Sequence, residues 1–458
     1  MIQTHTIAAI ATPNAPGAIG ILRLSGPEAV SIAAACFRPA GKKNLLERPQ
    51  RTMIFGTLLD REGEPIDQVL CTYTRGPASY TGEDTAELHC HGSPMVLTLG
   101  LEALYAQGAR PAQPGEFTQR AFLNGRLDLS QAEAVADLLD AQSREGVRHA
   151  AGQLSGALSR RVGQVYDGLV DIMAHFHAVL DYPDEDIDPF TQERLDRELS
   201  VQEEALTALL STYQRGRQLN QGIPCALVGR PNVGKSSLLN ALLGYERAIV
   251  TNIPGTTRDT VEERLELGGV PLRLIDTAGL RDSDDPIEQI GVARSRAAME
   301  GAGLILVLWE GTACPDEEER ALLQRASSLA PTILVWTKED LTSGSKADLE
   351  VAPGLPVVEV SAKTGRGLDE LAAAVAALFP KPSQAHYGEL LTNARQAEAA
   401  QRALDCVSRA RAALAAGVTP DALLLDVEQA LEALGQLTGQ SVREDVTSRI
   451  FARFCVGK

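Results

Sequence analysis

The sequence lacks the features that mark secreted, membrane or disulfide-stabilised proteins. Its seven cysteines are scattered and odd in number, and none forms a C-x-x-C pair. A disulfide framework or a zinc site is therefore not expected, and a reducing compartment is favoured. No apolar run approaches the roughly 18 residues that suggest a membrane span, and the start of the chain lacks the basic segment of a signal peptide. We expect a cytoplasmic protein without a membrane span.

Positive charge is scarce as well. The 458 residues carry a formal net charge of −17 at pH 7. This charge argues against indiscriminate binding to nucleic acids or membranes, although it permits a local basic patch for RNA. The sequence has no internal repeat and no long low-complexity tract, and its length predicts about two to four globular domains.

What the chain does contain is a phosphate-binding loop. Residues 229–236 read GRPNVGKS and have the form G-x-x-x-x-G-K-[ST]. A buried strand is predicted at 224–229 and a helix from 237 to 243, which is the context that the motif requires. In such a loop, glycines let backbone N–H groups face a phosphate, and Lys235 adds a positive charge. Ser236 is placed to hold Mg²⁺.

Two switch-like motifs follow in the expected order. Residues 255–259 read GTTRD and lie where a first switch loop belongs, with Thr257 as a second Mg²⁺ ligand. Residues 276–279 read DTAG and end a predicted strand. There Asp276 can reach Mg²⁺ through water, and the N–H of Gly279 can sense a γ-phosphate.

Two further motifs predict guanine recognition. Residues 337–340 read TKED and follow a predicted strand. The carboxylate of Asp340 can accept two hydrogens from the N1 and N2 edge of guanine, which adenine does not offer. Residues 361–363 read SAK, follow the last predicted strand, and can touch guanine O6 through backbone N–H groups. Five motifs in order on an alternating strand–helix pattern predict a GTP-binding domain.

The sequence departs from the usual pattern at Thr337. GTPases of this broad class usually carry Asn there, and its amide braces the phosphate loop against the base. Thr can donate and accept a hydrogen bond, but it is shorter. We expect guanine specificity to survive through Asp340, with weaker affinity.

Two groups that assist phosphoryl transfer are missing. Leu280 stands where Ras-like proteins place a water-orienting Gln, and Arg281 is more typical of a solvated switch residue than of an Arg finger. Asn232 could hold a monovalent cation in the place of an Arg finger, and Glu288 could orient the water. From the residues alone, Glu288 is more typical of a carboxylate at a helix start.

The rest of the chain divides into regions with different predicted secondary structure. Residues 1–122 mix strand and helix patterns and read as an α+β domain. Residues 123–215 and 380–458 are helical, whereas 216–379 alternate strands and helices in the manner of a parallel sheet. The simplest account is an α/β domain inserted into one helical domain. Strands are predicted at 18–24, 69–73, 273–276, 304–308, 332–336 and 356–360, with a helix at 94–107.

Two polar stretches are interpreted as structural segments and not as metal sites. The acidic segment 182–189 is bounded by prolines and is typical of a solvated connection rather than a metal site. Residues 79–92 are polar and glycine-bearing. His89 and His91 within them suggest a ligand pair, but ordinary packing on a strand is the favoured interpretation.

Long strings outside these motifs resemble the MnmE/TrmE family of tRNA-modification GTPases, and the resemblance covers the whole chain. It rests on residues 17–26, 80–84, 87–92, 114–118, 120–129 and 454–458. The resemblance implies a multidomain α/β and all-α fold. Its parts are an N-terminal α+β domain for folate binding and dimerisation, a helical domain, and an inserted Ras-like P-loop GTPase domain.

The resemblance also implies a function. It implies a homodimer whose GTPase is activated by potassium-dependent pairing of the G domains. With a flavoprotein partner of the MnmG/GidA type, in a heterotetramer, the family adds a carboxymethylaminomethyl-type group to carbon 5 of the wobble uridine of certain tRNAs. The one-carbon donor is a reduced folate, 5,10-methylene- or 5-formyl-tetrahydrofolate.

The family pattern assigns roles in GTP hydrolysis. Asn232, Lys235 and Glu288 are the expected catalytic residues, with Glu288 orienting the water. Asn232 and the backbone of Thr251, Ile253 and Thr256 resemble a K⁺ shell, and Ser236 and Thr257 hold Mg²⁺. The expected GTP or GDP contacts are Asn232, Val233, Gly234, Lys235, Ser236, Ser237, Thr251, Asn252, Ile253, Pro254, Gly255, Thr256, Thr257, Asp276, Thr277, Ala278, Gly279, Thr337, Lys338, Glu339, Asp340, Ser361, Ala362 and Lys363.

The folate site is expected at Arg23, Glu87, Arg126 and Lys458. Glu87 could accept two hydrogens from a pterin edge, and the arginines suit anionic or carbonyl groups. Relatives often have Lys where this chain has Arg126. Without the resemblance, Arg23 would be interpreted as a surface charge on a strand and Glu87 as a solvated carboxylate.

Cys455 has two interpretations. The C-terminal residues CVGK do not form a good prenylation box. A thiol near the one-carbon transfer centre is the functional alternative, although direct nucleophilic catalysis is the less favoured one.

Two other functions compete with the main hypothesis. A ribosome-assembly GTPase would share the nucleotide motifs, but this chain lacks a basic RNA-binding tail. A stand-alone folate enzyme would not explain the GTPase motifs.

Overall fold

The structure is a computed structural model, and it describes most of the chain. The described residues are 5–141, 143–181, 192–245, 263–275, 298–311, 315–341, 354–380, 387–418, 420–440, 451, 454 and 456–457. Contacts divide the chain into two compact units. One comprises Met1–Ala136, Val162–Val170 and Leu424–Lys458, and the other comprises Asp137–Arg161 and Asp171–Leu423.

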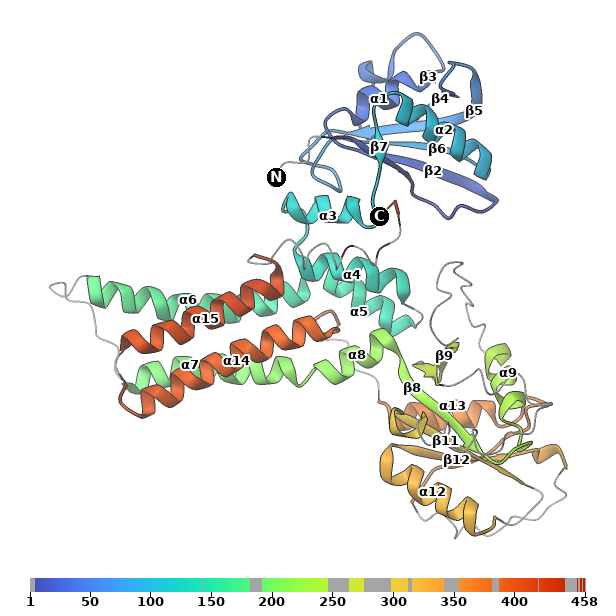
Figure 1. The fold of residues 1–458 in the computed structure, drawn as a ribbon, viewed down its shortest axis with the longest axis vertical. Coiled ribbons are helices and arrows are strands. Elements are labelled where there is room, and N and C mark those ends of the chain that lie inside the picture. Colours follow the sequence, from blue (N-terminus) through green and yellow to red (C-terminus); the bar gives the residue numbers. More distant parts are fainter. Residues whose placement is uncertain are drawn as a thin grey trace. The chain divides into compact units, whose positions relative to one another are not determined.

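The first unit contains a seven-stranded sheet in the order β3-β4-β5-β6-β2-β1-β7 (Figure 1). Neighbouring strands are antiparallel except β1 and β7, which are parallel. The strands are β1 (Ile7–Ile10), β2 (Gly17–Ser25), β3 (Phe37–Pro39), β4 (Ile54–Leu59), β5 (Pro65–Thr74), β6 (Thr85–Gly92) and β7 (Arg110–Pro111). The helices of this region are α1 (Ala29–Ala35), η1 (Leu45–Glu47), α2 (Pro94–Ala106), α3 (Glu116–Leu123) and α4 (Leu129–Asp140). This architecture agrees with the α+β prediction.

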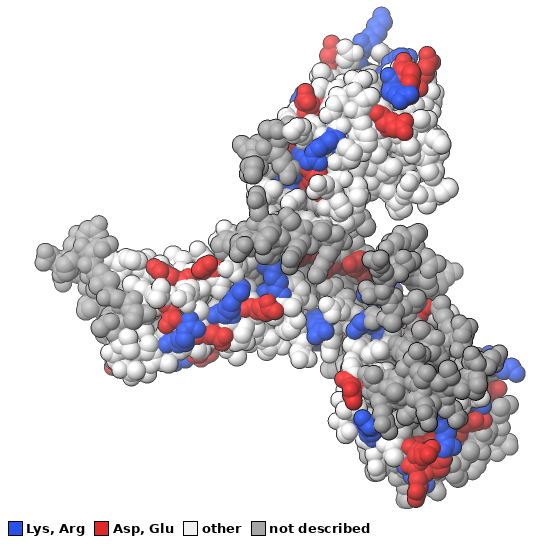
Figure 2. All heavy atoms as spheres, viewed as in Figure 1, with Lys and Arg blue, Asp and Glu red and all other residues white. Residues whose placement is uncertain are grey.

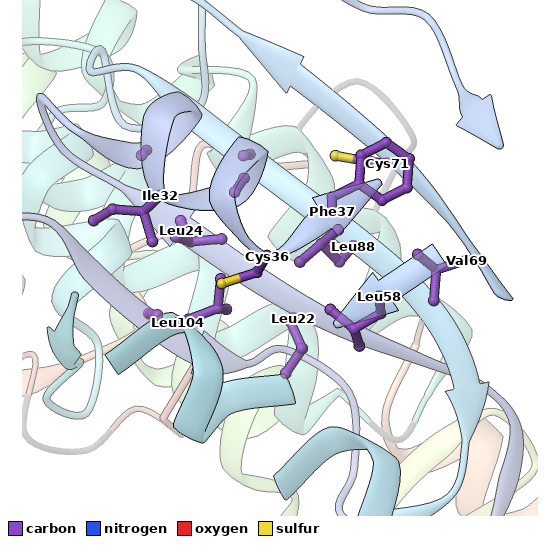
Figure 3. Packing of buried hydrophobic residues seen from close by; sticks show 14 of the residues in the cluster. Leu22, Leu24, Ile32, Cys36, Phe37, Leu58, Val69, Cys71, Leu88 and Leu104 are labelled. Atoms are coloured by element: carbon purple, nitrogen blue, oxygen red, sulfur yellow. The ribbon is translucent and has the colours of Figure 1, made fainter. Parts of the chain in front are cut away.

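One face of this sheet is buried. The other is open over parts of β2, β4 and β5 but covered at β1, where Ile7 and Ala9 pack with Phe117. Strand β6 shows how the buried face arises, since Ala86, Leu88 and Cys90 alternate with polar residues and are each at most 3% exposed. Leu22, Leu24 and Leu88 lie with residues of α1 and α2 in the buried core (Figure 3). Burial of one leucine side chain is worth about 1.5–3 kcal/mol.

The second unit contains helices and a six-stranded sheet. Helices that do not cover this sheet are α5 (Arg144–Leu154), α6 (Ala157–Asp181), α7 (Gln192–Leu210), α8 (Tyr213–Gln221), α14 (Ala394–Ala415) and α15 (Pro420–Thr438). Residues 162–170 of α6 and 424–438 of α15 belong to the first unit. Helices α7 and α14 pack together, and Arg411 of α14 pairs with Asp196 and Glu203 of α7. The buried face of α7 repeats leucines at helical spacing, as in Leu195 and Leu199.

The six-stranded sheet has the order β13-β12-β11-β8-β10-β9 and is parallel except for β9. Its elements are β8 (Ile223–Gly229), α9 (Lys235–Tyr245), β9 (Glu263–Leu267), β10 (Val270–Leu274), β11 (Leu304–Glu310), α12 (Glu317–Leu329), β12 (Thr332–Thr337), η2 (Glu339–Leu341), β13 (Val357–Glu359) and α13 (Leu368–Leu378). Strand β11 is buried on both sides, as in a sheet covered by helices on both faces. Because the strands are parallel, the ends of β8, β12 and β13 meet at one edge, where ligands bind in such folds.

Two findings concern disulfides and membrane-spanning helices. The cysteines that the structure describes are buried and form no disulfide, namely Cys36, Cys71, Cys90, Cys225 and Cys406. None of the helices in the described part of the chain has the length and apolar character needed to cross a membrane. The acidic segment 182–189 lies outside the described residues.

Candidate nucleotide and folate sites

The phosphate loop connects β8 to α9. The predicted strand and helix are both present, and β8 ends at Gly229 while α9 begins at Lys235. Gly229 has a φ of +154°, and a Cβ there would lie 2.5 Å from the carbonyl oxygen of Leu308. Only glycine therefore fits at this turn away from the sheet. Asn232 also has a left-handed backbone, with a φ of +62°, and its side chain is exposed.

Lys235 folds back over the loop. Its Nζ donates to the carbonyl oxygens of Gly229 at 2.8 Å and Arg230 at 2.7 Å. Burial lowers the pKa of Lys235 from its ordinary value. The ammonium group of Lys235 thus contacts two carbonyl oxygens of the loop itself. A phosphate bound in the loop would compete with these carbonyls for the ammonium group. Ser236 and Ser237 follow it on α9 and are exposed.

Arg230 attaches the loop to the first turn of α12. It forms an ion pair with Asp316, the N-cap of that helix, and lies 3.6 Å from Glu318 and 3.9 Å from Glu319. Asp316 and Glu319 also form a capping box. The loop is therefore held by an acidic helix terminus on one side.

Thr337 holds the loop from the side of the sheet. Its hydroxyl lies 2.5 Å from the carbonyl oxygen of Val233 and 3.1 Å from that of Trp309, and the residue is 5% exposed. A hydroxyl has one proton, so it can donate fully to one of these carbonyls at a time. Although Thr is shorter than the usual Asn, this side chain reaches the phosphate loop.

The two predicted base-recognition loops are joined by a hydrogen bond. Ser361 is fully buried, and its Oγ donates to Oδ1 of Asp340 at 2.8 Å. Lys338 has a left-handed backbone with a φ of +60°, and its Nζ lies 2.9 Å from Glu310. Glu339 pairs with Arg366 at 2.8 Å, and Lys363 is exposed. The structure thus brings the TKED and SAK motifs together at the same edge as the phosphate loop.

Many of the predicted GTP, metal and tail residues lie outside the described residues. They are Thr251, Asn252, Ile253, Pro254, Gly255, Thr256, Thr257, Asp276, Thr277, Ala278, Gly279, Leu280, Arg281, Glu288, Cys455 and Lys458.

Arg23 and Glu87, two of the predicted folate residues, are paired on the open face of the first sheet. They are direct cross-strand partners on β2 and β6, and Nε of Arg23 donates to Oε1 of Glu87 at 2.8 Å. The two side chains are 26% and 28% exposed, so the pair is accessible from solvent. The guanidinium carbon of Arg23 also lies 5.9 Å from the ring centre of Phe117.

The C-terminal tail reaches this pair. Nη1 of Arg23 donates to the carbonyl oxygen of Gly457 at 3.3 Å. Gly457 has a φ of +100°, and a Cβ there would lie 2.3 Å from the carbonyl oxygen of Ile10. The tail is therefore seated against β1 directly before Lys458.

A loop between β5 and β6 borders the same region. Tyr80 Oη lies 2.9 Å from Oγ1 of Thr118, and burial raises the pKa of Tyr80. Asn124 donates to the carbonyl oxygen of Thr81 at 2.7 Å. Arg126 is exposed and lies against this loop, since a Cβ at Gly82 would lie 3.3 Å from its Cγ.

A buried ion network fixes that loop to α3. Arg120 is 1% exposed, and it donates to Glu83 and to Glu116, each at 2.9 Å. Burial alone would raise the pKa of Glu116, but hydrogen bonds from Arg110, from the backbone N–H of Gln113 and from Arg120 outweigh it and lower the pKa. These charges are paired, as buried charges must be.

Comparison with known proteins identifies the family. A family model described as "MnmE helical domain" matches residues 129–455, and one described as "GTP-binding protein TrmE N-terminus" matches residues 6–126. The tRNA modification GTPase MnmE of Roseiflexus sp. (strain RS-1) is 44% identical over 472 residues, covering 100% of both chains. The chain belongs to the MnmE family of tRNA modification GTPases. The MnmE of Chloroflexus aurantiacus is 45% identical over 470 residues, with 100% of both chains covered.

Similarity within the MnmE family extends over the full length of both chains, so the predicted resemblance is confirmed. The MnmE of Symbiobacterium thermophilum is 44% identical over 456 residues, covering 99% of each chain. Among solved structures, the G domain of the T. maritima FeoB iron transporter is 30% identical and covers 34% of this chain and 97% of that one, with a TM-score of 0.26.

The sequence interpretation missed the environment of His89. Its side chain is 25% exposed, and its Nε2 lies 3.2 Å from Oε2 of Glu87, so it is not simply a packing residue. The period of two along β6 could have revealed this, since Glu87, His89 and His91 share one face of the strand. His91 instead contacts Asp67 at 2.8 Å, and no metal-binding cluster of acidic, His or Cys side chains occurs among the described residues.

Proposed function

We propose that this protein is a potassium-activated GTPase that uses a folate-derived one-carbon unit in modification of the wobble uridine of certain tRNAs. In this proposal it acts as a homodimer with a flavoprotein partner of the MnmG/GidA type. Membership of the family supports the proposal as a whole. The proposal that the protein binds GTP is supported mainly by the contact of Thr337 with Val233. This contact connects the predicted base-recognition motif to the phosphate loop.

The phosphate loop would bind GTP as follows. Lys235 would exchange two loop carbonyls for phosphate oxygens, which carry full negative charge and attract an ammonium more strongly. Ser236, exposed at the start of α9, and Thr257 would hold Mg²⁺, which when bound neutralises charge on the β- and γ-phosphates. Asp340 would select guanine with its carboxylate oriented by Ser361.

Potassium would bind beside the phosphate loop. The exposed side chain of Asn232 offers an amide oxygen, a suitable ligand for a hard cation, and the backbone of Thr251, Ile253 and Thr256 would complete the shell. When bound, K⁺ supplies positive charge where other GTPases use an Arg finger. Glu288 would orient the attacking water.

The open face of the first sheet would bind the reduced folate. Glu87 offers an acceptor for the pterin hydrogens, and Arg23 and Arg126 offer donors for carbonyl or carboxylate groups. The tail seated at Gly457 would bring Lys458 to the same place.

Two features support the proposed organisation. The six-stranded sheet lies in the sequence between α8 and α14, which supports a G domain at 216–379 inserted between helical segments 123–215 and 380–458. On the open sheet face of the domain at 1–122, Ile19, Phe55 and Leu70 are 63%, 52% and 39% exposed. Exposed apolar residues of this kind suit a dimer interface.

A folate titration tests the folate part of the proposal. We expect the full-length protein to bind 5-formyl-tetrahydrofolate, and we expect Glu87→Gln to weaken binding about tenfold or more because it removes the anionic acceptor. His91→Gln is the matched control, since His91 lies on the same strand but contacts Asp67. Isothermal titration of the three proteins measures this. Absence of binding by the unmodified protein would remove the folate from the proposal.

A further inference from the structure

The chain passes twice between the helices of the second unit and its six-stranded sheet. In the first crossing, α8 ends at Gln221 and β8 begins at Ile223, so only Gly222 separates helix from strand. Strand β8 then leads straight to the phosphate loop. In the second crossing, residues 387–393 return to the helices directly before α14.

The returning segment is seated closely between two helices. Gly388 has a φ of +87°, and a Cβ there would lie 2.3 Å from the carbonyl carbon of Gly152 in α5. Its N–H donates to Nδ1 of the buried His149 at 2.9 Å. On the other side, a Cβ at Gly216 of α8 would lie 2.1 Å from the carbonyl oxygen of Leu391. Because backbone meets backbone on both sides, this segment cannot shift without moving α5 or α8.

The carboxylate of Asp137 accepts a hydrogen bond from each of the two segments that connect the helices to the sheet. Oδ1 of Asp137 accepts a hydrogen bond from Nδ2 of Asn220 in α8 at 2.8 Å, and Oδ2 accepts one from Oγ1 of Thr392 at 3.2 Å. Thr392 is fully buried and Asp137 is half-buried. Hydrogen bonds to an ionised acceptor are stronger than neutral ones. Asp137 therefore links two residues that are 172 positions apart, Asn220 and Thr392, in addition to the backbone contact of Gly216 with Leu391.

Asp137 belongs to α4, a well-anchored helix of 12 residues. At its start, Asp128 accepts hydrogen bonds from Ser130 and from the N–H of Gln131 at 2.7 and 2.9 Å. The helix begins three residues after Arg126, one of the proposed folate residues. At 1.5 Å per residue it extends about 18 Å, and a capped helix of this length moves as one body.

We propose that Asp137 is a positioning residue that couples nucleotide binding to α4. A shift of β8 on exchange of GDP for GTP would move the end of α8, and the two hydrogen bonds of Asp137 would pass this movement to α4 and so toward Arg126. The inference rests on nucleotide binding at the phosphate loop and does not require that the protein bind folate.

Hydrogen exchange measured by mass spectrometry tests the coupling in the full-length protein. With GDP or a non-hydrolysable GTP analogue bound, we expect exchange in residues 129–140 to differ by about threefold or more between the two states. In Asp137→Ala this difference disappears, while GDP affinity stays within about twofold because the hydrogen bonds of Asp137 go to α8 and to the returning segment. Asp140→Ala, an exposed residue of the same helix, is the matched control and retains the difference.

Two outcomes overturn the inference. One is an unmodified protein whose exchange in 129–140 does not respond to the nucleotide. The other is a folded Asp137→Ala protein, with a melting temperature near that of the unmodified protein, that keeps the full response. If Asp137→Ala does not fold, Thr392→Val decides. It leaves Asp137 in place and removes the hydroxyl that donates to Oδ2 of Asp137 at 3.2 Å and lies 3.4 Å from Oε1 of Gln396, so it should reduce the response. A protein that fails to bind folate would leave this readout intact, so the two proposals fail separately.

Discussion

At the scale of single residues, the proposed function makes nucleotide affinity depend on how Thr337 contacts the phosphate loop and strand β11. Its one proton is shared between the carbonyls of Val233 and Trp309, at 2.5 and 3.1 Å. An Asn amide would offer two protons on a longer side chain. The chain therefore retains the contact between base motif and phosphate loop with fewer hydrogen-bond donors than the usual residue provides.

Thr337→Val should weaken GDP binding about tenfold, because losing one buried hydrogen bond is worth about 1.4 kcal/mol. Thr337→Ser keeps the hydroxyl and should remain within about twofold of the unmodified protein. Fluorescent-nucleotide titrations with GDP and inosine diphosphate measure both. The valine variant should lose affinity for the two nucleotides equally, since the base edge is read by Asp340. A loss confined to GDP, or no loss at all, would contradict the bracing role.

At the scale of elements, α5 and the segment that returns to α14 meet through His149. The residue is 3% exposed, and burial lowers its pKa to about 4. Its Nδ1 accepts the N–H of Gly388, which a protonated ring could not do. This joint therefore requires a neutral imidazole.

The folded-state pKa of His149 lies below the unfolded value near 6.5. The unfolded chain therefore binds the extra proton between these values, and stability falls as pH drops below 6.5. By pH 5 the loss should reach about 2 kcal/mol. Thermal unfolding at pH 7 and pH 5 measures it, and His149→Gln should show a smaller decrease. His177→Gln, an exposed histidine, is the control; equal pH dependence in all three proteins would refute the assignment.

The elements also show what a sequence can and cannot predict. The strand before the phosphate loop and the helix after it were predictable, because local motifs specify them. Strand β2 was found at Gly17–Ser25, where 18–24 was predicted. The strand predicted at 273–276 instead occupies Val270–Leu274 as β10. Element boundaries of this kind depend on pairing partners as well as on local pattern.

Contacts between distant residues were not predictable. The hydrogen bond of His149 with Gly388 spans 239 positions, and that of Arg23 with Gly457 spans 434. No local periodicity carries such information. Asp137 illustrates the same limit, since nothing in the sequence of α4 marks it as the partner of Asn220 and Thr392. Arg23 and Glu87 could be named only through the family resemblance, and their pairing followed from the register of β2 and β6.

At the scale of the whole molecule, charge constrains how tRNA can be contacted. The net charge is −17, and Figure 2 shows basic and acidic side chains interspersed over the described surface of the face in view, without a continuous basic patch there. Binding driven by phosphate contacts needs clustered Lys and Arg. In this proposal, RNA contact relies on a local patch or on the partner protein.

In the proposed function, potassium dependence belongs to the assembled molecule, because the cation site would act when two G domains pair. Replacing K⁺ by Na⁺ at constant ionic strength should reduce the GTP turnover number about tenfold or more, since the smaller ion fits a K⁺ shell poorly. Asn232→Ala should abolish the difference between the two salts. Steady-state phosphate release measures both, with Asn240→Ala, an exposed residue of α9, as the control. Equal rates in the two salts would eliminate the cation from the mechanism.

The central claim is that the GTPase acts in tRNA modification, and mass spectrometry of tRNA nucleosides tests it most directly. A strain deleted for the gene should lose the 5-carboxymethylaminomethyl-type uridine. The unmodified gene should restore it, whereas Lys235→Ala should not, because the loop then lacks its phosphate-binding ammonium. Intact modified uridine in the deletion strain, together with accumulated ribosomal precursors, would contradict the account and favour a ribosome-assembly GTPase.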